Sequence, residues 1–447
     1  MFFYFVVFFF FASLTASTSN DYITIKYVTV NKVERPLFYS KHTGYFWSIG
    51  LNTFMDTGDN NRLKKFFKTK KEELGNRYDD FYKKLYIQQL KFIQSKGFNS
   101  IYTWSNLTFL DNKLPFGVLL FDDGAYTVIT PLINYEGKSP PTGDGNEPCP
   151  IGDPYDEVYQ KSLDSYVKKV VSPYKENTQV LTYWLGAEFG VGDTEPTDFS
   201  SYVYSKGVQR HLTKWLKDEY HEIKKLNEAW VSSFDSFEQA ASTKSLTSVK
   251  YQKDIKMFSA NVIRDWFKLV VKTIHKYDPN HLVSSPKLSV WDFESLDKAF
   301  SLGHFDSLKG LFDLVSVDWY SSKPVHSEQG YKDLKKLSLL LNVPVLVAEF
   351  GTRQRINGWT NSPGAKSIVN TQKERAERYR TQTVAIFNDP TFIGVGWFRW
   401  QDHINEKYQF NKGIIKVENG QIEPYTELME AMGKVNKKIN EDISLAR

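Results

Sequence analysis

Two glutamates lie at the carboxyl ends of two strand-like apolar runs. Glu188 ends the run Val180–Glu188, and Glu349 is the next-to-last residue of the run Val343–Phe350. Continuous apolar runs of this length are typical of parallel strands that are buried on both faces. In a βα barrel, the carboxyl ends of the strands form the rim where catalytic groups collect. Two carboxylates facing each other there could cleave a glycosidic bond, because one can donate a proton while the other attacks or activates water.

Other strand ends carry side chains that could support this chemistry. Tyr320 ends an apolar run, and its hydroxyl could orient a nucleophilic carboxylate. A tryptophan-lined wall could raise the pKa of an acid/base glutamate by removing water. Aromatic residues make up 16% of the chain and could fill the core or stack on sugar rings. We predict substrate contacts from Trp104, Trp184, Tyr320, Trp397, Arg399, Trp400 and Asp402. The alternative is that both glutamates are structural rim residues held in salt bridges.

Short apolar runs alternate with longer amphipathic stretches, which is the pattern of repeated βα units. The helix period is clear in Arg77–Lys96, in Asp254–Tyr277 and in a last helix that starts near Pro424. The stretch Glu136–Asp156 is rich in Gly, Pro and Asp and is expected to be a long rim loop. We therefore predict an α/β fold, a single (β/α)8 TIM barrel with long rim loops. Its eight expected strands are Phe46–Phe54, Ser100–Trp104, Tyr126–Ile133, Val180–Glu188, Leu282–Pro286, Leu314–Tyr320, Val343–Phe350 and Phe392–Phe398.

The first residues resemble a secretory signal peptide. Phe2–Ala12 is almost wholly aromatic or Val, and small polar residues follow it. We predict a signal peptide over residues 1–17, a barrel domain over 18–447 and a secreted protein, with an uncleaved anchor as the alternative. After cleavage, no membrane association is expected. Cys149 is the only cysteine of the 447 residues, so no intrachain disulfide is possible. Asn106 begins the glycosylation sequon Asn-Leu-Thr, which has meaning in a secreted protein.

Several classes of function are poorly supported. The net charge of +5 is small for this length, and the basic residues do not cluster at a nucleic-acid-binding motif. The basic run 62–71 is followed at once by Glu72 and Glu73, which favours a solvated helix face over a groove for an anionic polysaccharide. After His221-Glu222, Lys225 stands where a zinc helix needs its second histidine. We therefore predict no metal, no cofactor and no nucleic acid, and a carbohydrate as the partner.

The chain resembles the clan A glycoside hydrolases, the retaining (β/α)8 class. Ser316–Tyr320 is similar to the sixth strand of that clan, whose Tyr touches the nucleophile. The resemblance implies that Glu188 is the acid/base on the fourth strand and that Glu349 is the nucleophile on the seventh. The carboxyl-terminal third is similar to family 50 beta-agarases and neighbouring beta-galactoside-cleaving families. Its matching segments are Gly394–Asp402, Asn411–Ile415 and Pro424-Tyr425, with Phe98–Ser105 and Asp278–Leu282 earlier in the chain.

Two positions depart from the clan pattern. Ala187 stands where most members have an Asn that binds the 2-hydroxyl of the cleaved sugar, a contact that strengthens in the transition state. Lys287, which we also expect to contact substrate, stands where an Arg is common after the fifth strand. The resemblance implies a secreted retaining glycoside hydrolase acting on a polysaccharide or oligosaccharide, with an agarose-like beta-galactan favoured. A carbohydrate-binding pseudoenzyme and a transglycosylase on the same barrel remain as alternatives.

Overall fold

Eight parallel strands form a closed barrel in the computed structural model. It describes residues 21–111, 113–121, 128–140, 151–187, 201–289, 308–320, 329–360, 367–418 and 420–445. Each barrel strand pairs with the next along the chain, and the last pairs with the first through Gly394 and Ser48. The single α/β barrel is therefore confirmed. The strands are β4 (Ser48–Leu51), β5 (Ser100–Ile101), β6 (Phe116–Leu119), β7 (Val180–Trp184), β8 (Val283–Ser289), β9 (Leu314–Asp318), β10 (Val345–Phe350) and β13 (Phe392–Trp397).

The third barrel strand is not the one expected from the sequence. Of the predicted strand Tyr126–Ile133, residues 126 and 127 lie outside the described residues, and 128–133 is loop with one isolated bridge at Pro131. β6 takes the place instead, pairing with β5 on one side and β7 on the other. The prediction of this strand was wrong because Pro115 and Gly117 look like turn residues.

Large aromatic rings fill the barrel, and glycines on neighbouring strands make room for them. Tyr102 and Trp184 are buried in the interior, together with Leu181, Leu314, Leu346 and Ile393. A Cβ at Gly117 would lie 1.6 Å from the Trp184 ring, and one at Gly50 would lie 2.3 Å from Tyr102. The indole nitrogen of Trp184 donates to Ser316 Oγ at 2.7 Å. Trp184, expected to contact substrate, is thus a core residue of the barrel.

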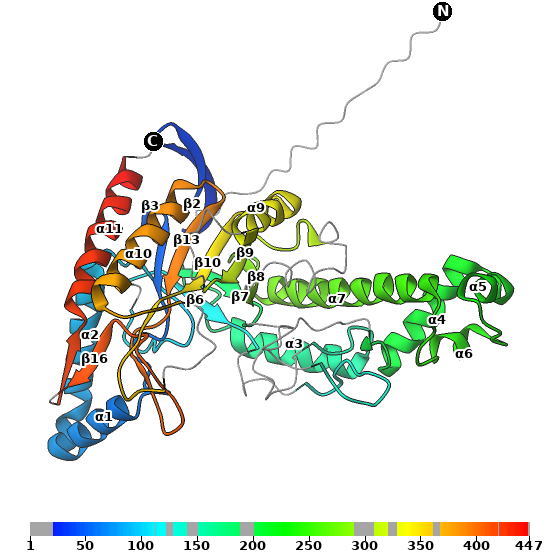
Figure 1. Cartoon of the computed structure of the whole chain (residues 1–447), viewed down its shortest axis with the longest axis horizontal. Helices are drawn as coiled ribbons and strands as arrows, with labels where there is room; N and C mark the ends of the chain where they lie inside the picture. Colours follow the sequence, from blue (N-terminus) through cyan, green and yellow to red (C-terminus); the bar gives the residue numbers. More distant parts are fainter. Residues whose placement is uncertain are drawn as a thin grey trace, which may run out of the picture.

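Helices cover the outside of the barrel (Figure 1). The predicted helix Arg77–Lys96 is confirmed as α2, and Gly97 after it adopts a φ of +77°. None of the helices within the described ranges combines the length and apolar composition needed to cross a bilayer. The helices are α1 (Asn61–Leu74), η1 (Gly75–Arg77), α2 (Tyr78–Ser95), α3 (Glu157–Val171), α4 (Lys206–Tyr220), α5 (Ile223–Trp230), α6 (Phe237–Ala241), α7 (Val249–Tyr277), α9 (Gln329–Leu341), α10 (Gln372–Asn388) and α11 (Thr426–Ser444).

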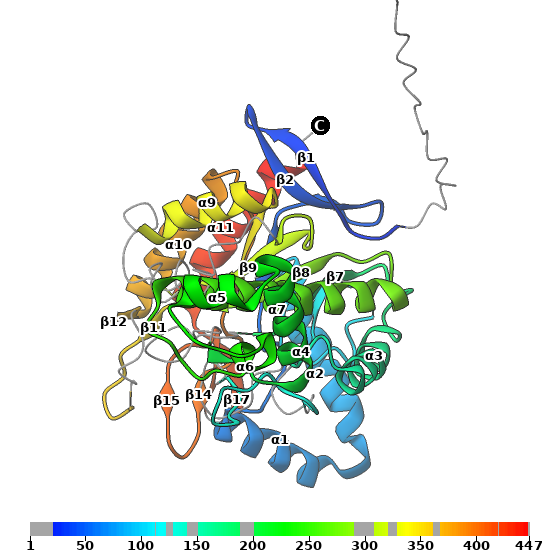
Figure 2. The ribbon, with the colours of Figure 1, turned by 90° about the vertical axis from the view of Figure 1, so that its right-hand side faces the viewer.

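A helical arm projects from one side of the barrel. α7 has 29 residues and spans about 43 Å at 1.5 Å per residue, starting earlier than the predicted Asp254. Figure 1 shows α4, α5 and α6 gathered around its far end, and Figure 2 views the arm end-on. The Asp254 carboxylate, fully buried there, accepts hydrogen bonds from the Tyr220 hydroxyl, from Trp230 Nε1 at 2.9 Å and from Lys250 at 2.8 Å. This carboxylate joins three helices of the arm.

A small antiparallel sheet that the sequence did not reveal packs on the barrel. It comprises β1 (Thr24–Val30), β2 (Val33–Ser40) and β3 (Gly44–Phe46). Ile23, Phe38 and Phe46 join the interior cluster of the barrel. β3 leads into β4, so the sheet covers the end of the barrel where the strands begin. Short hairpins and pairs lie near the opposite end: β11 (Arg353–Gln354) with β12 (Ile368–Val369), β14 (His403–Ile404) with β15 (Gln409–Phe410), and β16 (Ile415–Glu418) with β17 (Gln421–Pro424).

Candidate functional site

Glu349 lies near the carboxyl end of β10, the seventh barrel strand, and is 3% exposed. Its two carboxylate oxygens have different partners. The Tyr320 hydroxyl donates to Oε2 at 2.5 Å, and the Lys287 ammonium contacts Oε1. Tyr320 follows β9 and Lys287 belongs to β8, so three neighbouring strands place these groups at one point of the rim. The carboxylate is therefore held in a fixed orientation by one donor on each oxygen.

Lys287 is a fully buried cation between two carboxylates. Its Nζ lies 3.6 Å from Asp318 Oδ2 in addition to its contact with Glu349. It also lies 3.9 Å from the centre of the Trp104 ring, a cation–π geometry. Its backbone N–H donates to Gly186 O at 2.9 Å, which ties β8 to the chain just before Ala187. A buried ammonium needs such partners, because an uncompensated charge in the interior is costly.

An aromatic wall beside these groups comes from Trp104 and Phe398. The Trp104 ring lies 6.0 Å from Phe398, edge to face, and Phe398 lies 6.3 Å from Tyr320. Trp104 follows the second barrel strand in a left-handed conformation with φ +54°. Phe398 was missed by the sequence reasoning, although it immediately follows Trp397, the last residue of β13.

Trp397 points away from the mouth. It is 1% exposed and packs edge to face on Phe350 and Tyr379 of the outer core, with ring centres 5.4 and 5.6 Å apart. Successive strand residues point to opposite faces, and Gly396 faces the interior ring of Tyr102. The expectation that Trp397 stacks on the cleaved sugar is therefore not met, and Phe398 holds the position that faces Tyr320. Counting the alternation from the interior-facing Gly396 would have found it.

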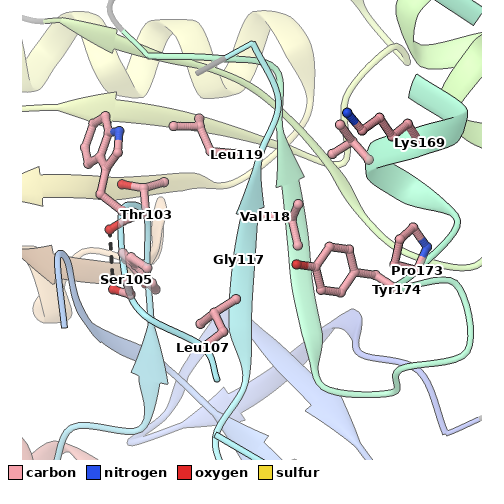
Figure 3. A pocket seen from close by; sticks show the side chains of 12 residues that line it. Thr103, Ser105, Leu107, Gly117, Val118, Leu119, Lys169, Pro173 and Tyr174 are labelled. Atoms are coloured by element: carbon pink, nitrogen blue, oxygen red, sulfur yellow. Dashed lines mark hydrogen bonds between the residues drawn. The ribbon is translucent and has the colours of Figure 1, made fainter. Parts of the chain in front are cut away.

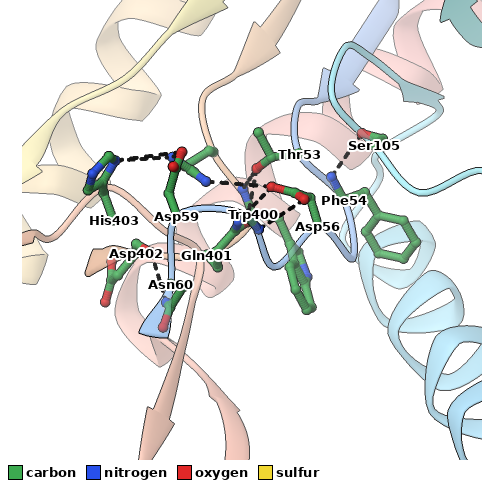
Figure 4. A network of polar contacts seen from close by, with 12 residues as sticks. Thr53, Phe54, Asp56, Asp59, Asn60, Ser105, Trp400, Gln401, Asp402 and His403 are labelled. Atoms are coloured by element: carbon green, nitrogen blue, oxygen red, sulfur yellow. Dashed lines mark hydrogen bonds and ion pairs between the residues drawn. The ribbon is translucent and has the colours of Figure 1, made fainter. Parts of the chain in front are cut away.

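Arg399, Trp400 and Asp402 lie in the loop after β13, and Figure 4 shows Trp400 and Asp402 there. Arg399 is 2% exposed, and its Nη1 donates to Asp59 at 2.9 Å. Trp400 is fully buried and packs edge to face on Phe54, with ring centres 5.9 Å apart. These two side chains are engaged within the protein, contrary to the expectation of direct substrate contact.

Asp402 is also a structural group. It is 1% exposed and accepts from the Tyr425 hydroxyl at 2.5 Å, from Gly413 N at 2.8 Å and from Asn411 Nδ2 at 3.1 Å. Burial raises the pKa of its carboxyl, and these donors oppose that shift. The carboxylate thereby joins the loop after β13 to the segment before α11, and it was wrongly expected to contact substrate.

The other predicted positions have mixed outcomes. Glu188 lies outside the described residues, which end at Ala187 in this part of the chain. Its distance to Glu349 therefore stays a prediction to be measured. Asn106 is half-buried, and its Nδ2 donates to the Tyr82 hydroxyl at 3.0 Å. Its glycosylation remains untested.

A cavity of about 370 Å³ opens where no helix lies between β5 and β6. Trp104 lines both this cavity and the group around Lys287. Figure 3 shows Thr103 and Ser105 on one side of it, and Lys169 and Tyr174 from the end of α3 on the other. Its size is within the range of small-molecule sites.

Comparisons with known proteins give the same assignment from independent sources. A family profile described as beta-galactosidase, glycoside hydrolase family 42, matches residues 136–438. Beta-agarase B of Vibrio sp. (strain JT0107) is 24% identical over 374 residues, covering 78% of this chain and 35% of the agarase. A beta-galactosidase of Planococcus sp. (strain L4) is 22% identical over 246 residues, covering 48% of this chain and 32% of that protein. This chain thus spans about a third of the length of these two relatives.

Solved structures show the same fold. An exo-beta-agarase superposes with a TM-score of 0.73 at 15% identity, covering 95% of this chain and 65% of that one. The agarase AgWH50C gives a TM-score of 0.72 at 14% identity, covering 94% of this chain and 65% of that one. The family profile covers well over half of the 447 residues, and the matched range includes both candidate glutamates. The chain therefore belongs to glycoside hydrolase family 42, the beta-galactosidase family, within the clan of TIM-barrel glycoside hydrolases.

Proposed function

We propose that this chain is a secreted retaining glycoside hydrolase that cleaves beta-galactosidic bonds in an agarose-like galactan or its oligosaccharides. The observation that carries the proposal is the carboxylate of Glu349, held by Tyr320 and Lys287 at the rim of the barrel. The substrate class is supported by the names of the relatives, which are beta-agarases and beta-galactosidases. Secretion is supported by the apolar run Phe2–Ala12.

In the proposed mechanism, Glu349 attacks the anomeric carbon and forms a covalent glycosyl ester. Glu188 protonates the leaving oxygen in this first step and removes a proton from water in the second. Tyr320 and Lys287 keep one oxygen of Glu349 aimed at the sugar and compensate its charge before the attack. Phe398 and Trp104 offer ring faces to the C–H faces of the sugar. Retention requires the two carboxyl groups to lie about 5 Å apart.

The test has two parts. Purified protein is assayed for reducing-sugar release on agarose, other galactans, mannans and glucans, with Glu349→Gln as the blank. Glu349→Ala is then given azide, a small external nucleophile, with an activated galactoside. Azide can enter the space left by the carboxylate and rescue turnover, and the product is then a galactosyl azide of inverted configuration. Release by the Glu349→Gln protein at the wild-type rate would refute the assignment of the nucleophile.

Ala187 favours a second candidate, a carbohydrate-binding protein without turnover. The amide of Asn at this position would hold the 2-hydroxyl of the cleaved sugar, and such contacts supply several kcal/mol in the transition state. Calorimetric binding of galactan oligosaccharides, with no product from the wild type, would support this candidate. In that case Ala187→Asn is the first variant to make, and its gain of turnover would locate the missing contact.

Secretion has its own test. The protein recovered from the culture medium of a secreting host is sequenced from its amino terminus. A start near residue 18 is expected, and recovery of the intact chain in the membrane fraction would support the anchor instead.

A further inference from the structure

Basic side chains gather on the rim next to the aromatic wall. The group consists of Arg353 after β10, Arg399 after β13 and Lys412 after β15, and we name it the rim cation cluster. Lys412 Nζ lies 5.0 Å from the Phe398 ring centre and 5.6 Å from Phe410. The Arg353 guanidinium lies 4.5 Å from the Phe410 ring centre. The three cations thus approach one another around two rings.

The members of the cluster differ in how their charge is compensated. Arg399 faces Asp59 at 2.9 Å and Asp56 at 3.8 Å. For Arg353, in contrast, no carboxylate of the described residues lies within ion-pair distance, and its guanidinium makes no hydrogen bond there. Burial lowers the pKa of Arg353 to about 10, and the Tyr320 hydroxyl is the group that opposes this shift. Arg353 is therefore a half-buried cation that has no anionic partner among the described residues.

A fully buried arginine, Arg375, shows how this chain satisfies a guanidinium elsewhere. Arg375 is fully buried, and its guanidinium donates five hydrogen bonds of 2.9–3.0 Å. The Arg353 guanidinium, in contrast, is half-buried and has no acceptor among the described residues, so its donors are available to an anionic ligand.

The backbone holds Arg353 in place before any ligand binds. Its N–H donates to Ser367 O at 2.9 Å, within the β11–β12 pair. The carbonyl of Thr352, the preceding residue, accepts from Arg375 Nε at 2.9 Å. These contacts fix the main chain at Arg353, and the face of the Phe410 ring, 4.5 Å from the guanidinium, supports its side chain.

The cluster borders the proposed nucleophile. Arg353 interacts electrostatically with Tyr320, and the Tyr320 hydroxyl is 2.5 Å from Glu349. On the outer side, Phe410 stacks on Tyr408 with ring centres 5.6 Å apart, and Tyr408 is 37% exposed. A sugar chain that left the catalytic point along Phe398 and Phe410 would come close to Arg353, whose guanidinium lies 4.5 Å from the Phe410 ring centre.

We propose that Arg353 and Lys412 form a subsite for an anionic group on the galactan, a sulfate ester or a carboxylate, beside the sugar that is cleaved. The planar guanidinium fork matches two oxygens of either group, and the ammonium adds a point charge. This inference rests on the proposed function and sharpens it, because it makes the substrate an acidic galactan.

The experiment measures binding, so that it does not depend on turnover. Calorimetry with Glu349→Gln compares three beta-galactan tetrasaccharides of equal length, one neutral, one sulfated and one containing a uronic acid. We expect at least one anionic ligand to bind about tenfold tighter than the neutral one at low ionic strength, and the difference to shrink in high salt. The anionic ligand that binds more tightly tells whether the subsite prefers a sulfate ester or a carboxylate.

In the same Glu349→Gln background, Arg353→Gln is expected to reduce the preference for the anionic ligand, measured as the ratio of its affinity to that of the neutral one, to about twofold or less. The matched control is Arg355→Gln, which removes the same charge two residues away from an exposed side chain and should keep the ratio. Thermal unfolding checks that each variant is folded. If Arg353→Gln does not fold, the same affinity ratio is measured with Lys412→Gln.

Equal affinity for all three ligands overturns the subsite, as does a preference that survives in Arg353→Gln or, if that variant does not fold, in Lys412→Gln. A preference that depends on these cations, found in a protein with no hydrolysis, would leave the subsite standing and refute only the proposed function.

Discussion

Replacing Lys287 by Met should destabilise the protein in a pH-dependent way. The methionine has a similar length and no charge, so the change leaves the carboxylates of Glu349 and Asp318 facing each other without their shared cation. Removing one partner of a buried ion pair costs about 3–5 kcal/mol. The entropy of unfolding scales with chain length, so this loss corresponds to a decrease of roughly 3–5 °C in Tm for a domain of this size.

The sign of the pH dependence follows from the two carboxyl groups. Without the ammonium, the folded variant should hold a proton on one of them to a higher pH than the unfolded chain does. Such a group stabilises the fold at low pH and loses that contribution as the pH rises. The difference in Tm between wild type and Lys287→Met should therefore be greatest near neutral pH and shrink toward pH 4–5.

Differential scanning calorimetry over this pH range measures both effects. Lys287→Arg keeps a charge at the position and should recover part of the loss. Lys272→Met is the matched control, because Lys272 is an exposed lysine of α7. Adding Glu349→Gln to Lys287→Met should restore part of the stability by removing one of the two facing charges. A Lys287→Met protein as stable as wild type at neutral pH, with the same pH profile, would refute the reasoning.

Three further changes test other parts of the fold. Gly117→Ala should cost about 3 kcal/mol or more in urea unfolding, because its Cβ would overlap the Trp184 ring inside the barrel; a loss below about 1 kcal/mol would contradict this. Asp254→Ala leaves the Trp230 and Tyr220 donors unpaired, which should lower the stability of the helical arm by about 3 kcal/mol. Limited proteolysis should then cut within α4–α7 while the barrel stays intact. Cleavage no faster than in wild type would argue against this role of Asp254. Burial lowers the pKa of His403 to about 4. The unfolded chain therefore takes up this proton first, and the free energy of unfolding should fall by about 1–2 kcal/mol as the pH falls from 6.5 toward 4. His403→Asn should reduce the dependence of Tm on pH in this range, and an unchanged dependence would exclude His403 as its source.

The barrel could be predicted because seven of its eight strands overlap the runs expected from the sequence, although Gly50, Pro286 and Gly394 interrupt three of them. The eighth, β6, contains Gly117, and the need for that glycine arises from Trp184 on the neighbouring strand. A contact between residues so far apart in sequence leaves no local pattern. The β1–β3 sheet was missed for a related reason, since its apolar residues point into a barrel end formed by strands that follow later.

The site was predictable to the level of strand ends and no further. Glu349, Tyr320, Lys287 and Trp104 do lie together, because each lies on or shortly after a strand of the same barrel. Which side of a strand a residue takes depends on register and bulges, so Trp397 was preferred to Phe398. Polar groups such as Asp402 could not be separated from substrate contacts, because their partners Asn411 and Tyr425 are distant in sequence.

The β1–β3 sheet also has a consequence for the order of events on the ribosome. Ile23 and Phe38 are made first, yet their interior cluster includes Leu346 and Ile393, more than 300 residues later. At cellular synthesis rates, the interval between them is on the order of tens of seconds. Throughout that time the apolar side of the nascent sheet has no barrel to cover. Closure of β13 onto β4 ends this exposure, so the chain depends on late residues to protect its earliest ones, and a chaperone would be of most use before residue 397 emerges.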